Sequence, residues 1–163
     1  MAVYEASRRN PTVVDRGFQL AYVCAYRLMR TYWKVSHPNT HGALVTLWNN
    51  GEVLLVRNSY VPYYSAPGGY VRTGEASRDA AIRELREEIG VIANPDQLSL
   101  VYDGVKDWEG KKDHVEIFTL DVADRPRIDV DNREVIEASW FTKERAFALN
   151  LFPPLREAIA ARG

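Results

Sequence analysis

The sequence has a single cysteine, no long apolar run and almost no net charge, and each of these absences excludes a class of protein. Cys24 alone cannot form an internal disulfide, which fits a reducing cytoplasm and a role as buried filler. The longest apolar stretch, residues 17–26, spans only about ten residues, too short to cross a bilayer, and no small-residue cleavage site follows it. A net charge of −1 gives no electrostatic reason to expect a nucleic acid or an anionic membrane as partner.

The remaining composition is that of an ordinary globular domain. Hydrophobic residues make up 46% of the chain and charged residues 26%. A chain of 163 residues can bury a core large enough to need no disulfide or structural metal. No internal repeat or low-complexity segment interrupts it.

Periodicity and turn residues predict strands mixed with helices. We expect helices over residues 18–34, 77–89, 142–149 and 153–161, and strands over residues 43–48, 53–57, 70–71, 98–104, 114–122 and 135–141. A hairpin turn is expected at residues 49–52 and a charged turn at residues 107–113, with Ser77 as helix N-cap and Gly90 as a left-handed helix end. Because helices and strands do not alternate regularly, this order predicts an α+β or mixed α/β fold.

The helix over residues 77–89 carries the most informative pattern. Glu84, Glu87 and Glu88 are three and four residues apart, so their side chains occupy one arc beside the buried face centred on Leu85. Three carboxylates in one arc repel each other unless a cation lies among them. Oxygen ligands of this kind suit Mg²⁺, with Mn²⁺ as the alternative, rather than zinc.

Residues 69–91 resemble the Nudix box: Gly69, five residues, Glu75, seven residues, then Arg-Glu-aliphatic-any-Glu-Glu-any-Gly-aliphatic. The match has no gap and no substitution at a defining position. The alternative, a solvated acidic helix face, does not explain why the flanking glycines and Glu75 are in register. The resemblance implies an α/β/α sandwich with a mixed central sheet over residues 38–163, preceded by a helical extension over residues 1–37.

The resemblance also assigns roles within the box. It implies that Glu84, Glu87 and Glu88 are catalytic metal ligands, with Glu84 either a ligand or the base, and that the Gly69 carbonyl is a further ligand. Supporting residues of the site are Gly68, Glu75 and Arg83. The glycines let the backbone approach the metal-binding helix, and Glu75 and Arg83 form a structural ion pair that orients the loop on that helix.

Residues outside the box are open to alternatives. The family's further acid precedes a tryptophan, which favours Glu134, six residues before Trp140, then Glu137, then Glu116. Arg57 is placed where the family often has a phosphate-contacting base, and the alternative is a solvated strand end. Three loop aromatics, Tyr63, Tyr64 and Trp108, are expected to stack on a nucleobase or else to cover the core. The histidines His37, His41 and His114 show no metal-ligand spacing and are expected to be loop or strand-end residues.

The predicted function is metal-dependent hydrolysis of a pyrophosphate bond in a nucleoside diphosphate linked to another moiety, such as a nucleotide, a sugar or a second nucleoside. The alternative is a catalytically silent Nudix-fold nucleotide-binding or regulatory module, against which the intact acid set argues. An isoprenoid diphosphate isomerase would need a cysteine near the site, and Cys24 lies in the extension. The departures from the family pattern before Pro67 and at Arg72 leave the substrate open. The expected partner is therefore a small molecule, with no nucleic acid and no membrane.

The helix over residues 18–34 has an apolar stripe wider than a surface helix of a monomer requires. The stripe consists of Phe18, Ala21, Tyr22, Ala25, Tyr26, Met29 and Trp33. Because tyrosine and tryptophan are common at interfaces, we favour a homodimer that uses this helix. The alternative is that the helix packs on its own domain and covers an edge of the sheet. A polar face with few Lys and Arg makes membrane docking the weakest interpretation.

Overall fold

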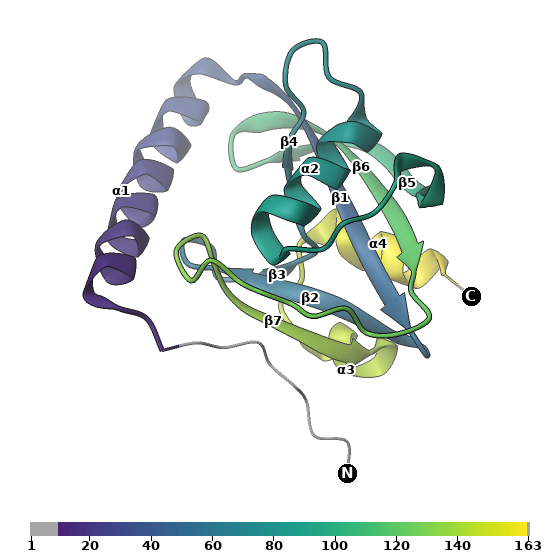
Figure 1. The fold of residues 1–163 in the computed structure, drawn as a ribbon. Coiled ribbons are helices and arrows are strands. Elements are labelled where there is room, and N and C mark those ends of the chain that lie inside the picture. Colours follow the sequence, from purple (N-terminus) through teal and green to yellow (C-terminus); the bar gives the residue numbers. More distant parts are fainter. Residues whose placement is uncertain (1–9, 163) are drawn as a thin grey trace.

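A computed structural model describes residues 10–162, so residues 1–9 of the predicted extension lie outside it. A mixed sheet of seven strands lies between helices (Figure 1). Helix α2 (Ser77–Ile89) covers one face, and helices α3 (Lys143–Ala148) and α4 (Pro153–Ala161) cover the other. A long helix, α1 (Val13–Ser36), lies beside the sandwich, and a 3₁₀ turn (Pro95–Gln97) follows α2. The predicted α/β/α architecture is confirmed.

The strands are β1 (Asn39–Asn49), β2 (Glu52–Asn58), β3 (Tyr64–Ser65), β4 (Gly68–Tyr70), β5 (Ser99–Trp108), β6 (Lys111–Asp121) and β7 (Val135–Thr142). Their order is β3-β2-β1-β6-β5, with β4 paired to β1 and β7 paired to β2. Strands β1 and β6 are parallel, and the other pairs are antiparallel. Strand β1 pairs with β4 near its start and with β2 near its end, so it links the two halves of the sheet.

Alternation along β1 separates two cores. Ala43, Val45 and Leu47 pack on the side of α2, whereas Leu44 and Trp48 belong to the cluster under α4. Helix α2 buries Ala80, Ala81, Leu85, Glu88 and Ile89 against the first of these cores. Full burial of Leu85 or Ile89 contributes about 1.5–3 kcal/mol each. This packing fixes the rotation of α2 and therefore the direction in which its acidic arc faces.

Helix α2 has the predicted bounds, but one of its two predicted caps is wrong. Gly90 ends the helix in the left-handed region, with φ of 73°, as expected. Ser77 is the first helical residue, and Ala76, which makes no side-chain cap, occupies the N-cap position. The Ser77 hydroxyl donates instead to Glu116 of β6, a contact that local sequence rules cannot show.

The predicted charged turn at residues 107–113 is also wrong. Strands β5 and β6 continue through most of it and leave only Glu109 and Gly110 in the turn. The cross-strand register explains the difference, because Lys106 lies opposite Asp113 and Asp107 lies opposite Lys112. Opposite charges facing each other across an antiparallel pair stabilise the ladder. The charges were therefore a strand signal and not a turn signal.

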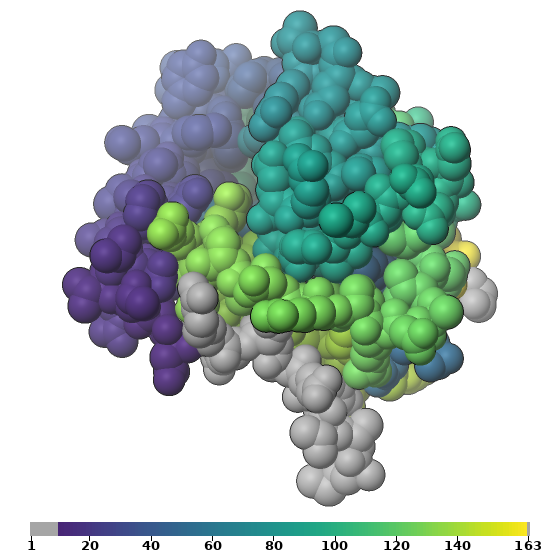
Figure 2. Space-filling model, viewed as in Figure 1, coloured from purple at the N-terminus to yellow at the C-terminus, as the bar shows by residue number. Residues whose placement is uncertain are grey.

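Helix α1 packs on its own domain in this chain. Trp33 is buried under the β5–β6 turn, with Lys111 Nζ 4.9 Å from the centre of its ring. Gln19 donates to the Asn132 carbonyl at 2.7 Å, and Tyr26 lies 5.0 Å from Tyr60 between ring centres. Figure 2 shows the green segment around residue 130 lying between the start of α1 and α2. The apolar stripe therefore faces the sandwich.

A second group of apolar side chains on α1 faces outward: Leu20, Leu28, Tyr32 and Val35 are exposed. Cys24 is exposed with them, so its predicted role as buried filler is wrong. Among the helices of residues 10–162, none is both long and apolar enough to cross a membrane. The predicted homodimer used the apolar stripe, which packs on the chain's own domain here; dimerisation itself is not tested and remains a prediction.

Candidate active site

Two glycines of β4 bring the backbone against the acidic side of α2. A Cβ added at Gly69 would lie 2.6 Å from the Glu84 carboxyl carbon, and one added at Gly68 would lie 2.4 Å from the Ala43 carbonyl oxygen. The Gly68 N–H donates to Glu88 Oε2 at 2.9 Å. This close approach requires residues without a Cβ and places the backbone of β4 directly beside two box glutamates.

Within residues 10–162, Glu88 has no Lys, Arg or His side chain as an ion-pair partner. Its side chain is buried, and that burial raises its pKa well above the ordinary value. The Gly68 N–H favours the charged form, but the negative charges of Glu134 and Glu84 raise the pKa further. Buried acids that face one another in this way favour a cation between them. Their oxygen donors fit the hard divalent ion expected from the sequence.

Glu134 is the candidate downstream acid that the structure brings to the box. Tyr60 donates its hydroxyl to Glu134 Oε1 at 2.8 Å, and the Glu134 carbonyl accepts from Ser59 at 2.8 Å. Burial raises the pKa of Glu134, and the charge of Glu84 adds to this effect. The Asp131 carboxylate accepts the backbone N–H of Glu134 at 3.1 Å and thereby holds the loop.

The other two candidate acids lie elsewhere. Glu137 is 3.5 Å from Arg57 Nε and accepts the Tyr64 hydroxyl at 3.2 Å. Glu116 lies near the start of α2, where it contacts Ser77 and His41. Pairing of β2 with β7 and of β1 with β6 gives these two acids other partners, and neither is among the charges that raise the pKa of Glu88; sequence spacing alone could not decide this.

Arg83 joins the loop to the acids of α2. Its Nε lies 2.8 Å from Glu75 Oε1, and its Nη2 donates to the Tyr70 carbonyl at 3.0 Å. Hydrogen bonds from this guanidinium lower the pKa of Glu75 to about 2. Arg83 Nη1 also donates to Glu84 and lies 3.7 Å from Glu87. The guanidinium therefore positions Glu84 as well as the loop.

The box glutamates are not arranged alike. Glu84, Glu88 and the loop acid Glu134 lie near enough that the charges of Glu84 and Glu134 raise the pKa of Glu88, whereas Glu87 has 48% of its side chain exposed. Within residues 10–162, no three of the acids Glu84, Glu87, Glu88 and Glu134 have ligand atoms that all lie within 4.8 Å of one another. Arg83 accounts for part of this separation, because it holds Glu84 toward the loop.

Two cavities adjoin these acids. One, of about 150 Å³, is lined by Gly68 and Gly69, and the other, of about 280 Å³, lies under α1 and is lined by Glu134. Both are lined by Tyr26, Tyr60 and Tyr70, so they are neighbours. Their walls combine aromatic rings with a few polar atoms, as ligand sites do.

The sequence predicts one residue of this aromatic wall, Tyr63, and misses Tyr26, Tyr60 and Tyr70. Tyr63 lines the first cavity, whereas Tyr64 directs its hydroxyl to Glu137 and its ring to Phe141 at 5.7 Å. Arg57 lies opposite Tyr64 in the β2–β3 pair and is outside the cavity lining too. The available signals were the tyrosine-rich loop after β2 and the wide aromatic stripe of α1, which was interpreted as an interface.

Comparisons with known proteins identify the family of this chain. A family model described as the NUDIX domain matches residues 38–161. A putative 8-oxo-dGTP diphosphatase from Bacillus subtilis is 44% identical over 55 residues, which cover 33% of this chain and 37% of that protein. An NAD-capped RNA hydrolase NudC from Pseudomonas aeruginosa is 32% identical over 128 residues, which cover 73% of this chain and 40% of that protein. The chain thus spans well under half the length of these two relatives.

A solved structure, the MutT protein of Methanosarcina mazei Go1, has the same fold. It superimposes with a TM-score of 0.66 and 22% identity, covering 77% of this chain and 94% of that one. The matched family segment contains β4, α2 and the loop acid, which are the parts that form the acidic site. On this evidence the chain belongs to the NUDIX domain family.

Proposed function

We propose that this protein hydrolyses a pyrophosphate bond in a nucleoside diphosphate linked to another moiety and that it depends on a divalent metal ion. The observation that supports this most is the buried Glu88, which accepts the Gly68 N–H and has its pKa raised further by the charges of Glu134 and Glu84. Two relatives, a putative 8-oxo-dGTP diphosphatase and an NAD-capped RNA hydrolase, support cleavage of a phosphoanhydride. Mg²⁺ is the preferred ion and Mn²⁺ the alternative.

The ligands proposed for the ion are Glu84, Glu87, Glu88, Glu134 and the Gly69 carbonyl. A bound divalent ion neutralises phosphate charge and lowers the pKa of a bound water. Glu84, whose carboxylate Arg83 holds in place, serves either as one of these ligands or as the base that accepts a proton from the attacking water. Tyr60 fixes the Glu134 carboxylate, and its own hydroxyl stays protonated because burial and the nearby Glu134 charge raise its pKa.

The nucleoside part of the substrate is proposed to enter the neighbouring cavities. The rings of Tyr26, Tyr60, Tyr63 and Tyr70 offer flat apolar faces to a base. Asp113 adds a polar edge to the first cavity, where its carboxylate is held by Lys111 at 2.7 Å. This arrangement gives one helix, α1, a direct part in the substrate site through Tyr26.

The test is a panel of nucleotide sugars, dinucleotides, NTPs and dNTPs with Mg²⁺ or Mn²⁺, followed by phosphate release after a coupled phosphatase. Cleavage at the pyrophosphate, stopped by chelator and by Glu88→Gln, is expected. A folded protein that cleaves none of these compounds with either ion would refute the hydrolase.

The second candidate is a silent nucleotide-binding or regulatory module. It is favoured by one contact: Arg83 donates to Glu84 and thereby partly neutralises the acids without a metal ion. Calorimetry distinguishes the two functions. Nucleotide binding without turnover, unaffected by Mg²⁺, supports the module, whereas metal-dependent cleavage supports the enzyme.

Location and assembly complete the proposal. We place the protein in the cytoplasm because its lone cysteine is exposed and unpaired, which suits a reducing compartment. We also propose a homodimer through the outer side of α1, where Leu20, Leu28, Tyr32 and Val35 are exposed.

A further inference from the structure

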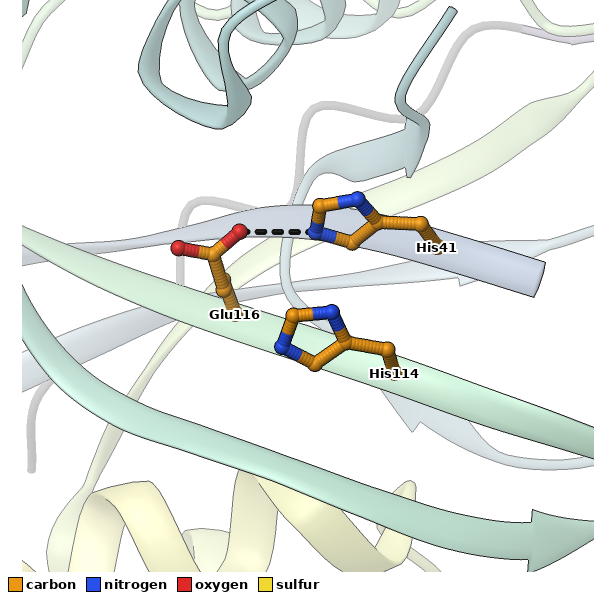
Figure 3. Close-up of side chains that lie close together, drawn as sticks. All are labelled: His41, His114 and Glu116. Carbon is orange, nitrogen blue, oxygen red and sulfur yellow. Dashed lines mark hydrogen bonds and ion pairs between the residues drawn. The ribbon is translucent and has the colours of Figure 1, made fainter. Parts of the chain in front are cut away.

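Two histidines and a glutamate meet on the face of the sheet that α2 covers. Strands β1 and β6 are parallel, and their register places His41 directly opposite His114 and Ala43 opposite Glu116. Because alternate residues of a strand share a face, Glu116 lies on the same side as His114. Figure 3 shows the three side chains together, with the two imidazole rings one above the other.

The cluster is tight and half-buried. His41 Nε2 lies 2.7 Å from Glu116 Oε2, and the rings of His41 and His114 are 4.3 Å apart with an angle of 14° between their planes. One ligand atom from each of the three residues lies within 4.8 Å of the other two. The exposed side-chain fractions are 35% for His41, 15% for Glu116 and 38% for His114.

Two neighbours extend the cluster. Asp103 of β5 lies opposite Glu116 in the sheet, and its Oδ1 accepts a hydrogen bond from His114 Nε2 at 2.7 Å. Ser77, the first residue of α2, donates its hydroxyl to Glu116. The cluster therefore joins three strands and the start of the helix that carries the box glutamates.

The donor set differs from that of the active site. Imidazole nitrogens suit zinc and similar transition ions, whereas all-oxygen sites suit Mg²⁺. In a tetrahedral zinc site, bond lengths of about 2.0–2.1 Å put ligand atoms about 3.4 Å apart. His41 Nε2 and Glu116 Oε2, which are 2.7 Å apart, would therefore separate by less than about 1 Å, and the distances from these atoms to His114, at most 4.8 Å, would shorten by no more than about 1.4 Å. Side chains that are half-exposed can make that adjustment by rotating about χ1 and χ2.

We propose that His41, His114 and Glu116 bind a divalent transition-metal ion such as Zn²⁺, with Asp103 either as a fourth ligand or as the partner that orients His114. This site is separate from the acidic one, because Ser77 and Glu84 are about 10 Å apart along a helix that rises about 1.5 Å per residue. An ion there ties the first turn of α2 to β1, β5 and β6. The inference does not depend on the proposed hydrolase activity, since its test measures metal binding.

The experiment uses the full chain, stripped of metal by chelation and then kept in excess Mg²⁺ to saturate the acidic site. Titration with Co²⁺, followed by its visible d–d absorption, and equilibrium dialysis with Zn²⁺ are expected to show one ion per chain. The variants His41→Ala and His114→Ala are each expected to weaken binding by at least about 100-fold, because each removes a ligand. Zn²⁺ is expected to raise the melting temperature of the wild type and not that of the double variant, which combines His41→Ala with His114→Ala.

Two matched variants show whether the binding is specific. His37→Ala removes a histidine whose Nδ1 lies near the Gly110 carbonyl at 3.2 Å, outside the cluster, and should leave binding unchanged. Glu88→Gln should also leave it unchanged, because that residue belongs to the acidic site. Asp103→Asn distinguishes the two roles of Asp103. If Asp103 only orients His114, metal affinity should fall by about 10–100-fold, and if it is a ligand, metal affinity should fall further.

The folding of each variant is checked by circular dichroism, and His114→Gln replaces His114→Ala if the latter is unfolded. A folded wild type that takes up no Co²⁺ or Zn²⁺ under these conditions overturns the proposal. So does binding that survives in the folded double variant or that is lost equally in His37→Ala.

Discussion

Replacing Gly69 with alanine should disable the acidic site while the fold remains intact. An alanine Cβ would lie 2.6 Å from Cδ and Oε1 of Glu84 and 3.0 Å from Oε2. Carbon atoms in contact prefer about 3.5–4.0 Å, so the carboxylate must move by about 1 Å. A misplacement of that size costs about 100-fold in rate when the group acts on the reacting atoms.

The stability of the Gly69→Ala variant should change little. Gly69 is outside the left-handed region of φ that strains other residues, and the group that must move is the end of a flexible side chain. Alanine also restricts the unfolded chain, which stabilises a protein by about 0.4–1 kcal/mol at a compatible position. We therefore expect the free energy of unfolding to stay within about 1 kcal/mol of wild type.

The assay compares kcat and KM with thermal unfolding for three glycine variants. Gly17→Ala is the control, because a Cβ there meets nothing within 4 Å, and it should raise stability by about 1 kcal/mol with activity unchanged. Gly68→Ala should lose stability, since its Cβ would meet the backbone of Ala43 and Leu44 at 2.4 and 2.6 Å. A folded Gly69→Ala variant with the wild-type kcat would refute the reasoning, because the position of Glu84 would then be immaterial.

Four more predictions concern single residues. Glu88→Gln should lower kcat by about 1,000-fold or more, a loss of about 4 kcal/mol of transition-state stabilisation. The metal-free variant should melt at a higher temperature than metal-free wild type, because the variant has no buried carboxylate at this position. A variant with wild-type kinetics would contradict this. Glu134→Gln should reduce kcat more than it raises KM, and the exposed Glu157→Gln is its control. Arg83 lowers the pKa of Glu75, so the ionised Glu75 stabilises the fold at pH values above its ordinary pKa of 4.5. The Glu75→Gln variant should therefore melt at a lower temperature than wild type, and this difference should shrink as pH falls toward about 2. A difference that does not change with pH would exclude this ion pair as the cause. Leu28→Glu should convert a dimer into a monomer by light scattering, and a monomeric wild type would end the dimer proposal.

Local interactions explain what could be predicted without the structure. The bounds of α2, its left-handed Gly90 and the turn at Asn50 and Gly51, which have φ of 48° and 81°, follow from residues within four positions of each other. Contacts between helix residues three and four positions apart, and the backbone freedom of glycine, involve only residues close in the sequence. They can therefore be predicted from the sequence. The carboxylate arc of α2 follows from the same helical period.

Tertiary pairing decided the rest. Glu134, Glu137 and Glu116 were open alternatives because loop spacing does not determine which strand a residue finally neighbours; the β2–β7 and β1–β6 registers separated them. His41 and His114 are 73 residues apart and meet only because their strands pair in parallel. The sequence by itself determined a helix with three acids on one side, since that depends on neighbouring residues. Which distant acid joins them, what α1 covers and where the histidines gather depended on packing between segments far apart in the chain, which only the folded structure brings together.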